Sequence, residues 1–246
     1  MNLHGIHLHS FALPSTRQEE TCFVLLALNG GIAGGFGSIY CGHVFANAET
    51  GNMISLFSEL HAGQWLGVLS RLGGLGLYIL GIALTVILPM RLFGGDTRRW
   101  QRACLLVEAI CFGIQAVLPY EQLTSISYAL YLWPVFFALA LQYNTFTALH
   151  GVPVSTVFCT NNFRQMTLHA LVWRRMRHTR TPDAASQATR ELHISLTYLV
   201  VTATFFFGVA LSVFTLEYLG IGQMAFCAVL LLVLWIWQMA TRKKDA

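Results

Sequence analysis

The chain has 246 residues, of which 55% are hydrophobic and only 11% are charged. Its mean hydropathy is +0.58 and its formal net charge is +4. Soluble domains carry about 25% charged residues, so this composition excludes a soluble globular fold, and basic residues scattered over connecting loops predict no nucleic-acid partner.

Six apolar windows follow one another along the chain and predict an all-α, polytopic membrane protein with six transmembrane helices. A helix satisfies its own backbone groups in lipid, and about 20 residues cross a hydrocarbon core of about 30 Å. We expect a single membrane domain over residues 21–240, followed by a basic cytoplasmic tail at 241–246. The predicted spans are 21–40, 66–90, 103–119, 126–149, 192–216 and 219–240.

The first 20 residues form a tail ahead of the first span. They contain no basic region followed by an apolar core, so we predict no cleavable signal peptide. His4, His7 and His9 could bind a metal weakly, but the tail supplies no fixed fourth ligand. We therefore predict no metal site and no cofactor.

A short, half-polar segment follows the first span. Residues 45–60 read FANAETGNMISLFSEL and contain the T-G-N motif, which is Thr50, Gly51 and Asn52. The ten residues from Asn52 to His61 would make a helix of about 15 Å, half the thickness of the hydrocarbon core. Two interpretations stay open: Thr50 or Asn52 caps an amphipathic interfacial helix, or the segment is a re-entrant helix that reaches the midplane.

Two acidic residues are candidates for proton or ion coupling. Glu49 precedes the T-G-N motif, where it is either a relay partner of His43 or an acid favoured by the positive end of a helix. Glu108 lies in the third window, with Gln115 two turns further on about the same face. Intramembrane carboxylates usually face a cavity or a partner, although Glu108 is also close enough to Arg102 to be an interfacial surface group.

The second half of the chain repeats the motif. The T-N-N motif, which is Thr160, Asn161 and Asn162, lies 110 positions after the T-G-N motif. Gln142 and Asn144 precede it near the inner end of the fourth window. These two amides either line a cavity or bond to neighbouring helices.

The basic residues predict the orientation of the spans. With both termini in the cytoplasm, 14 of the 15 Lys and Arg residues fall on the inner side, as the positive-inside rule requires, and only Arg71 falls near the outer end of the second span. A rival count makes 43–62 and 151–173 full spans, which gives eight and places polar side chains in lipid. We prefer six. The 14 inner residues are Arg17, Arg91, Arg98, Arg99, Arg102, Arg164, Arg174, Arg175, Arg177, Arg180, Arg190, Arg242, Lys243 and Lys244.

The two motifs divide the domain into halves of three spans, about 21–119 and 126–240. Because three is odd, the second half is inverted in the membrane relative to the first, and the short segments approach from opposite faces. Their N-termini would present free N–H groups and about +0.5 charge each, which favours a small polar or anionic solute. The predicted binding residues are Thr50, Gly51, Asn52, Gln142, Asn144, Thr160, Asn161 and Asn162.

The chain carries no recognisable catalytic motif. It contains no H-E-x-x-H and no G-x-S-x-G sequence, so we do not predict an enzyme. The six cysteines form no C-x-x-C pair and lie in or beside apolar windows, which indicates small buried hydrophobic residues rather than disulfides or a zinc site.

These features together resemble the YoaK-type membrane proteins of bacteria, the DUF1275 family, over roughly residues 20–240. The resemblance rests on a glycine-rich first span with Phe45 and the T-G-N motif, and on Gln142, Asn144 and the T-N-N motif. The family's usual Asp, 16 residues before the motif Thr, is replaced here by Gly34, whereas Asn144 keeps that spacing in the second half. The resemblance implies a fold and the bacterial inner membrane, but no substrate.

We expect a small-solute transporter or channel with its site at the interface of the two inverted repeats. The alternative is a structural or regulatory membrane protein without transport. The lipid bilayer is the expected partner, and a homo-oligomer is compatible with either function. If the chain transports a solute, its polar membrane residues should converge on one cavity: Asn29, Glu108, Gln115, Gln142 and Asn144.

Overall fold

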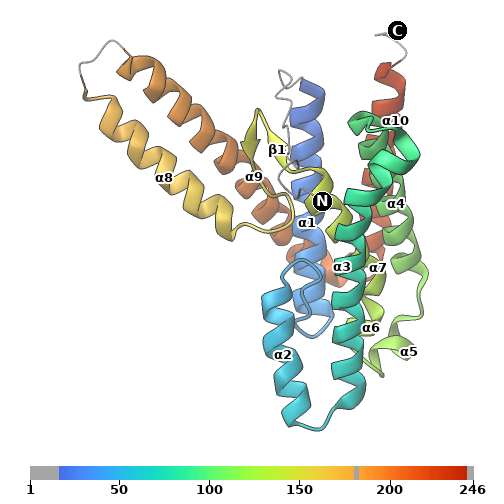
Figure 1. Ribbon diagram of the computed structural model, residues 1–246. Helices are drawn as coiled ribbons and strands as arrows, with labels where there is room; N and C mark the ends of the chain where they lie inside the picture. The colour runs from blue at the N-terminus through green and yellow to red at the C-terminus, as the bar shows by residue number, and fades with distance from the viewer. Residues whose placement is uncertain (1–16, 180–182, 243–246) are drawn as a thin grey trace, which may run out of the picture.

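The computed structural model describes residues 17–179 and 183–242, and it confirms the predicted all-helical architecture. Figure 1 shows a bundle around α1, from which α8 and the first part of α9 project as a hairpin. The elements are α1 (Arg17–Tyr40), α2 (Glu49–His61), α3 (Trp65–Phe93), α4 (Thr97–Val117), α5 (Tyr120–Thr124), α6 (Tyr128–Tyr131), α7 (Trp133–Thr145), β1 (Ala148–Leu149), β2 (Val152–Pro153), α8 (Thr160–Met176), α9 (Ala184–Leu219) and α10 (Gly222–Arg242).

Within the described residues, five helices are long and apolar enough to cross a membrane: α1, α3, α4, α9 and α10. They correspond to five of the six predicted spans. The predicted fourth span, 126–149, is instead divided among α6, α7 and a β-hairpin. Pro134 lies at the start of α7, where its missing N–H prevents α6 and α7 from forming one continuous helix. The count of six spans therefore stays a prediction.

The β-hairpin after α7 was not predicted from the sequence. Ala148 pairs with Pro153, and Leu149 pairs with Val152. The turn consists of His150 and Gly151, which both have a positive φ, 54° and 71°. Such angles suit a tight hairpin turn. The helix α7 has already ended at Thr145, and the hairpin lies between it and the second short segment.

Each long helix packs on partners that are distant in the sequence. α1 packs on α9, and α3 packs on α7. α4 contacts both α7 and α10, and α10 also contacts α1. The short helices fold back on the helices that follow them, α2 on α3 and α8 on α9, and so make two hairpins.

Glycines set the close crossing of α1 and α9. A Cβ atom added at Gly31 would collide with the backbone oxygen of Phe205, and one added at Gly208 would collide with the backbone oxygen of Leu28. Small residues that allow two backbones to approach are the usual basis of tight helix pairs in membranes. This crossing encloses α1, whose apolar window is 72% buried.

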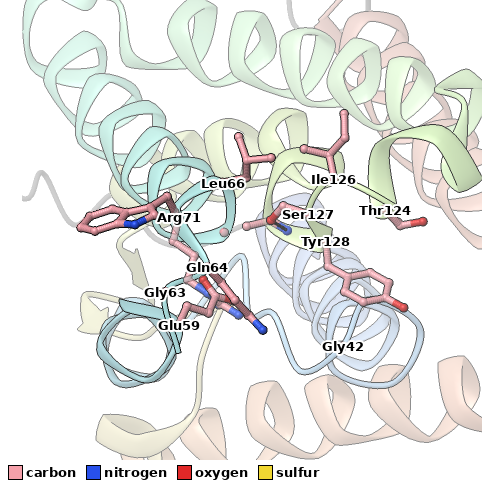
Figure 2. Close-up of a pocket in the computed structure, with 13 residues that line it drawn as sticks. Gly42, Glu59, Gly63, Gln64, Leu66, Arg71, Thr124, Ile126, Ser127 and Tyr128 are labelled. Carbon is pink, nitrogen blue, oxygen red and sulfur yellow. Dashed lines mark hydrogen bonds and ion pairs between the residues drawn. The ribbon is translucent and has the colours of Figure 1, made fainter. Parts of the chain in front are cut away.

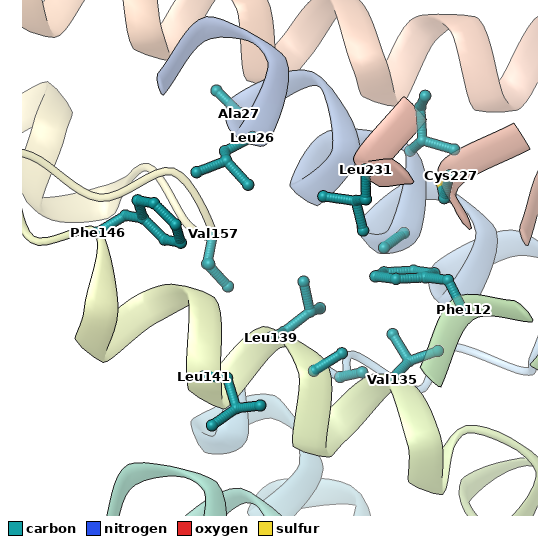
Figure 3. Close-up of a cluster of buried hydrophobic side chains, with 14 of the residues drawn as sticks. Leu26, Ala27, Phe112, Val135, Leu139, Leu141, Phe146, Val157, Cys227 and Leu231 are labelled. Atoms are coloured by element: carbon teal, nitrogen blue, oxygen red, sulfur yellow. The ribbon is translucent and has the colours of Figure 1, made fainter. Parts of the chain in front are cut away.

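The core lies where α1, α4, α7 and α10 meet. Figure 3 shows Leu26 and Ala27 of α1, Phe112 of α4, Leu139 of α7 and Leu231 of α10 facing a shared interior. All five side chains are buried. In lipid this packing stabilises the bundle through close van der Waals contact rather than through exclusion of water.

The helix ends sort into two groups. The start of α1, the α3–α4 turn and the end of α10 lie at one end of the bundle, and the α2–α3 turn and α5 lie at the other (Figure 1). At the α3–α4 turn, Gly94 ends α3 in the left-handed region with φ 58°. The carboxylate of Asp96 then accepts the backbone N–H of Arg99 at 3.0 Å and begins α4, which holds the pKa of Asp96 below its ordinary value.

Candidate functional site

The asparagines of the two motifs make the same contact in both halves. Asn52 accepts the backbone N–H of Phe45 at 3.1 Å and donates its amide to the oxygen of Phe45 at 2.6 Å. Asn162 does the same with Ser155, at 3.1 and 2.7 Å. Each asparagine thus acts as a clamp on the residue seven positions earlier. Phe45 and Ser155 are themselves 110 positions apart.

The prediction that Thr50 or Asn52 caps the first short helix is wrong. The N-cap of α2 is Ala48 and that of α8 is Cys159, and neither helix has a side-chain cap. The asparagine amides are engaged elsewhere because the preceding extended residues need hydrogen-bond partners that a helix would have supplied. Asn52 and Asn162 are accordingly 1% and 0% exposed.

The remaining motif residues face outward. Thr50, Thr160 and Asn161 are exposed in the first turns of α2 and α8, and Gly51 is half-buried. The free N–H groups of a helix N-terminus lie in this same first turn. In each motif the asparagine side chain therefore points inward and holds the segment that precedes the helix, while the first turn of the helix stays accessible.

The segments that precede α2 and α8 meet inside the protein. The buried Asn47 donates its side-chain amide to the oxygen of Val157 at 2.8 Å, across 110 positions of sequence. Gln142 ties α7 to this junction, because its amide donates to the oxygen of Leu26 at 3.1 Å and to the Thr156 hydroxyl at 2.8 Å. The junction joins both motif segments to α1 and α7.

The two amides predicted in the fourth span therefore bond to neighbouring elements. Gln142 is fully buried at the junction. Asn144 is half-buried and donates to the hydroxyl of Thr85 on α3. Only Gln142 thus lies next to a motif segment.

Arg71 extends the first clamp toward the surface. Its Nε donates to Glu59 at 2.9 Å, and its Nη1 donates to the Asn52 side-chain oxygen at 3.3 Å. Arg71 is 5% exposed although it lies within a candidate span. This contact was not predicted from the sequence, in which Arg71 is only an exception to the charge rule. A cation and an acid 12 positions apart in apolar surroundings were the available signal.

A cavity of about 650 Å³ opens beside this ion pair. Figure 2 shows Glu59 and Arg71 on one side, and Thr124, Ser127 and Tyr128 on the other. The first pair comes from α2 and α3, and the others come from α5, α6 and the loop between them. The cavity therefore lies at the end of the bundle that carries the α2–α3 turn.

Glu49 lies beside the first clamp at the start of α2. One carboxylate oxygen accepts a hydrogen bond from the amide of Asn52 at 3.3 Å, and the other is buried with no partner in the described part of the chain. Burial raises the pKa of Glu49 to about 7, although the hydrogen bond from Asn52 opposes the shift. Glu49 can therefore gain or lose a proton near neutral pH. No hydrogen bond or ion pair among the described residues joins it to His43.

Glu108 is fully buried in α4, so it is not an interfacial surface group. Among the described residues neither of its carboxylate oxygens has a hydrogen-bond partner, and the side-chain amides of Gln115 and Asn29 also lack partners there. Three buried polar side chains without partners are unusual. No hydrogen bond among the described residues links them to the clamps.

The second hairpin carries its own pair of titratable side chains. His169 lies at the position of α8 that corresponds to Glu59 of α2, and its ring contacts the Glu191 carboxylate of α9. Among the described residues no group of three His, Cys, Asp or Glu side chains could hold a metal ion. All six cysteines are free and buried. The three histidines of the N-terminal tail lie outside the described residues.

Residues 22–237 match the family described as a protein of unknown function, DUF1275. The chain belongs to the DUF1275 family. Comparison with curated proteins and with solved structures finds no match. The membership confirms the family resemblance, and the DUF1275 match covers both clamps, the junction and the cavity.

Gly34, where the resemblance implied an aspartate, lies at the junction. A Cβ atom added at Gly34 would lie 2.9 Å from the amide nitrogen of Asn47, the group that donates to Val157. An aspartate there would thus contact the same amide. In this DUF1275 member the junction is instead closed by a backbone oxygen, and the glycine leaves room for the Asn47 side chain.

Proposed function

We propose that this DUF1275 protein is a membrane transporter or channel for small polar solutes. Its site would lie at the interface of two inverted repeats, where the segments before α2 and α8 meet. The observation that carries the proposal is the pair of identical asparagine clamps, because each holds an extended backbone segment ahead of a short helix. Non-helical backbone inside a membrane domain is tolerated where it is enclosed by protein or lines a water-filled cavity.

The helix packing supports a repeat of four helices. If α1–α4 correspond to α7–α10, the contact of α1 with α9 matches that of α7 with α3. The contact of α4 with α7 likewise matches that of α10 with α1, and the two hairpins match each other. In Figure 1, α2 and α8 start near the middle of the molecule and run toward opposite ends, as an inverted repeat requires.

The starts of the short helices supply the chemistry for a solute. Each helix N-terminus offers unpaired N–H groups and about half a positive charge. Thr160, Asn161 and Arg164 are exposed at the start of α8, and Thr50 is exposed at the start of α2. Charged and polar side chains at membrane depth usually face a water-filled cavity, which favours an aqueous path to this position.

The buried Glu108 suits a coupling role within the same proposal. A carboxyl group without any partner in an apolar interior is strongly disfavoured when ionised. Such a group carries a proton until a conformational change exposes it to water. We extend the proposal to proton coupling through Glu108, with Glu49 as a second titratable group beside the first clamp, and to the bacterial inner membrane with both termini cytoplasmic.

One observation favours the alternative, a membrane protein without transport. Asn52, Asn162, Asn47 and Gln142 are all buried and engage neighbouring groups, so the junction is closed in this conformation. A purely structural junction would look the same. The two functions differ in whether the exposed starts of α2 and α8 lie on a path for solute.

Flux through the purified protein separates these two functions. Proteoliposomes would be tested with urea, glycerol, glycine and acetate, using Thr50→Cys and Thr160→Cys labelled with a bulky thiol reagent. Ser58→Cys and Thr167→Cys are matched controls, because both are exposed on the same helices farther from their starts. The six native cysteines are buried, which limits background labelling.

We expect flux of at least one solute above that of empty liposomes, and inhibition by label at positions 50 and 160 but not at 58 and 167. Absence of flux for all four solutes would favour the structural alternative. If label at positions 50 and 160 leaves the flux unchanged, the proposal that the solute site lies at the junction is contradicted.

A further inference from the structure

The cavity beside Arg71 and Glu59 has the features of a built binding site. Its volume of about 650 Å³ is within the range of small-molecule pockets, about 300–1,000 Å³. Its lining comes from the α2–α3 hairpin, from the segment that leads into α7, and from Gly42 after α1. Three separate parts of the chain thus close around it, and both of its charged lining residues belong to one ion pair.

Arg71 keeps hydrogen-bonding capacity for a ligand. A guanidinium group has five N–H donors, and Arg71 commits one to Glu59 and one to Asn52. Its Nη2 has no hydrogen-bond partner among the described residues and is not fully buried. Because Arg71 lines the cavity, solvent reaches this nitrogen from the cavity. The two N–H groups of Nη2 can both donate hydrogen bonds to an oxyanion.

Glu59 offers the opposite charge next to it. One oxygen accepts from Arg71, and the other is buried without a hydrogen-bond donor among the described residues. That second oxygen lies in space left by Gly67, where an added Cβ atom would come within 2.6 Å of it. The Glu59 side chain keeps 20% of its exposure and lines the cavity. Because the second oxygen is buried against Gly67, a cation would approach the oxygen that accepts from Arg71.

The charge of the site selects the class of ligand. A simple anion would gain the Arg71 edge but meet the repulsion of Glu59, and a simple cation would meet the repulsion of Arg71. A zwitterion satisfies both groups at once. Trp65 and Tyr128 also line the cavity, and aromatic faces attract an ammonium group.

We propose that this cavity binds a small zwitterion, with its oxyanion on Arg71 and its ammonium group on Glu59. The inference deepens the proposed function and takes from it that the chain handles a small solute. A free amino acid and the headgroup of phosphatidylethanolamine share this chemistry. Arg71 also bonds to Asn52, so occupation of the cavity reaches the first clamp directly. In the second hairpin His169 stands at the position of Glu59 and contacts Glu191.

The test is an equilibrium titration of the purified full chain in detergent, read by tryptophan fluorescence. Trp65 lines the cavity, and the variant Trp65→Phe identifies its contribution to the signal. Four probes of similar size differ in charge: glycine, acetate, methylammonium and acetamide. The variants are Arg71→Lys, which keeps the charge but removes the Nη2 edge, and Glu59→Gln. The control is Arg99→Gln, which breaks an exposed ion pair with Asp96 at the α3–α4 turn.

We expect a saturable change with glycine that is absent from Trp65→Phe. Acetate, methylammonium and acetamide should bind about tenfold more weakly or worse, because each lacks at least one charge-assisted contact. Arg71→Lys and Glu59→Gln should each weaken glycine by about tenfold, and Arg99→Gln should not. Equal binding of acetate and glycine, or no saturable signal with any probe on the wild-type chain, would overturn the proposal without requiring any variant to fold.

A second arm identifies the source of the zwitterion. In nanodiscs of phosphatidylethanolamine, glycine affinity should fall about tenfold relative to phosphatidylglycerol if the lipid headgroup occupies the cavity, and should be unchanged if a free solute does. Unchanged glycine binding in Arg71→Lys and Glu59→Gln would overturn the site in either lipid. Because this titration measures no flux, a failure of transport in proteoliposomes and a failure of zwitterion binding are separate results.

Discussion

At the scale of single residues, Asn52 and Asn162 replace missing backbone partners. We expect Asn52→Ala and Asn162→Ala each to destabilise the protein by about 1–3 kcal/mol, because the first removes the partner of the part-buried Phe45 N–H and the second removes the partner of the part-buried Ser155 N–H. Thermal unfolding in detergent measures this loss. Asn161→Ala is the matched control, since Asn161 is exposed, and its unfolding temperature should stay near that of the wild type. Equal stability of all three variants would contradict the role of the clamps.

Glu49 makes stability depend on pH. Its pKa is raised from 4.5 to about 7 in the folded state, so the folded protein holds this proton more tightly than the unfolded chain. The contribution of Glu49 to stability is therefore complete below pH 4.5 and is lost as the pH rises to about 7. The unfolding temperature of the wild type should decline over this window relative to that of Glu49→Gln. Parallel pH profiles of the two proteins would contradict the assignment.

Residue types indicated the importance of the motifs but not the role of each side chain. The repeat identified Asn52 and Asn162 because polar residues recur at a fixed offset. Their partners could not be predicted, since a clamp depends on where the extended backbone of Phe45 or Ser155 runs. The contact of Arg71 with Asn52 was equally hidden, because it joins residues 19 positions apart through a turn of unknown path.

At the scale of elements, the crossing of α1 and α9 depends on two glycines. We expect Gly208→Ala to destabilise the protein by about 3 kcal/mol, because the added methyl group collides with backbone of α1. Gly113→Ala is the matched control, since a Cβ atom there meets nothing within 4 Å, and it should be neutral or stabilising by up to about 1 kcal/mol. The readout is the unfolding temperature, and similar values for both variants would contradict the tight crossing.

Long apolar helices were predictable because their signal is local. Five windows became helices of nearly the expected extent, and the two short segments became α2 and α8. The broken region from α5 to β2 was not predictable in this way. Its apolar composition resembles that of a continuous span, but Pro134 and the turn at His150 and Gly151 interrupt it. Hydropathy averages over such interruptions.

At the scale of the whole molecule, reporter fusions test the orientation. Fusions after Gly95 and Thr179 should both report the cytoplasm, and a fusion after Gly63 should report the outer side. This follows from six spans with two short helices and from the placement of the arginines. An external signal at Gly95 would instead support the count of eight spans. The Gly63 fusion serves as the internal control, because the six-span topology places it opposite the other two.

The pairing of helices across the whole molecule could not be derived from composition or charge. Those properties indicate how many segments enter the membrane and which ends share a side. They do not indicate that α1 packs on α9 rather than on α2 or α4. The packing of α1 on α9 depends on the shapes of their glycine-lined faces. The hydrogen bond from the Asn47 amide to the Val157 oxygen depends on this packing.

The enclosure of α1 also has a consequence for biosynthesis. Gly31 emerges from the ribosome 177 positions before its packing partner Gly208, which corresponds to roughly 10–35 s at about 5–20 residues per second. During that interval α1 must stay in the bilayer with its glycine face uncovered and with Asn29, buried in the finished protein, open to lipid. Among the described helices, α1 is thus made first and completed only when α9 arrives.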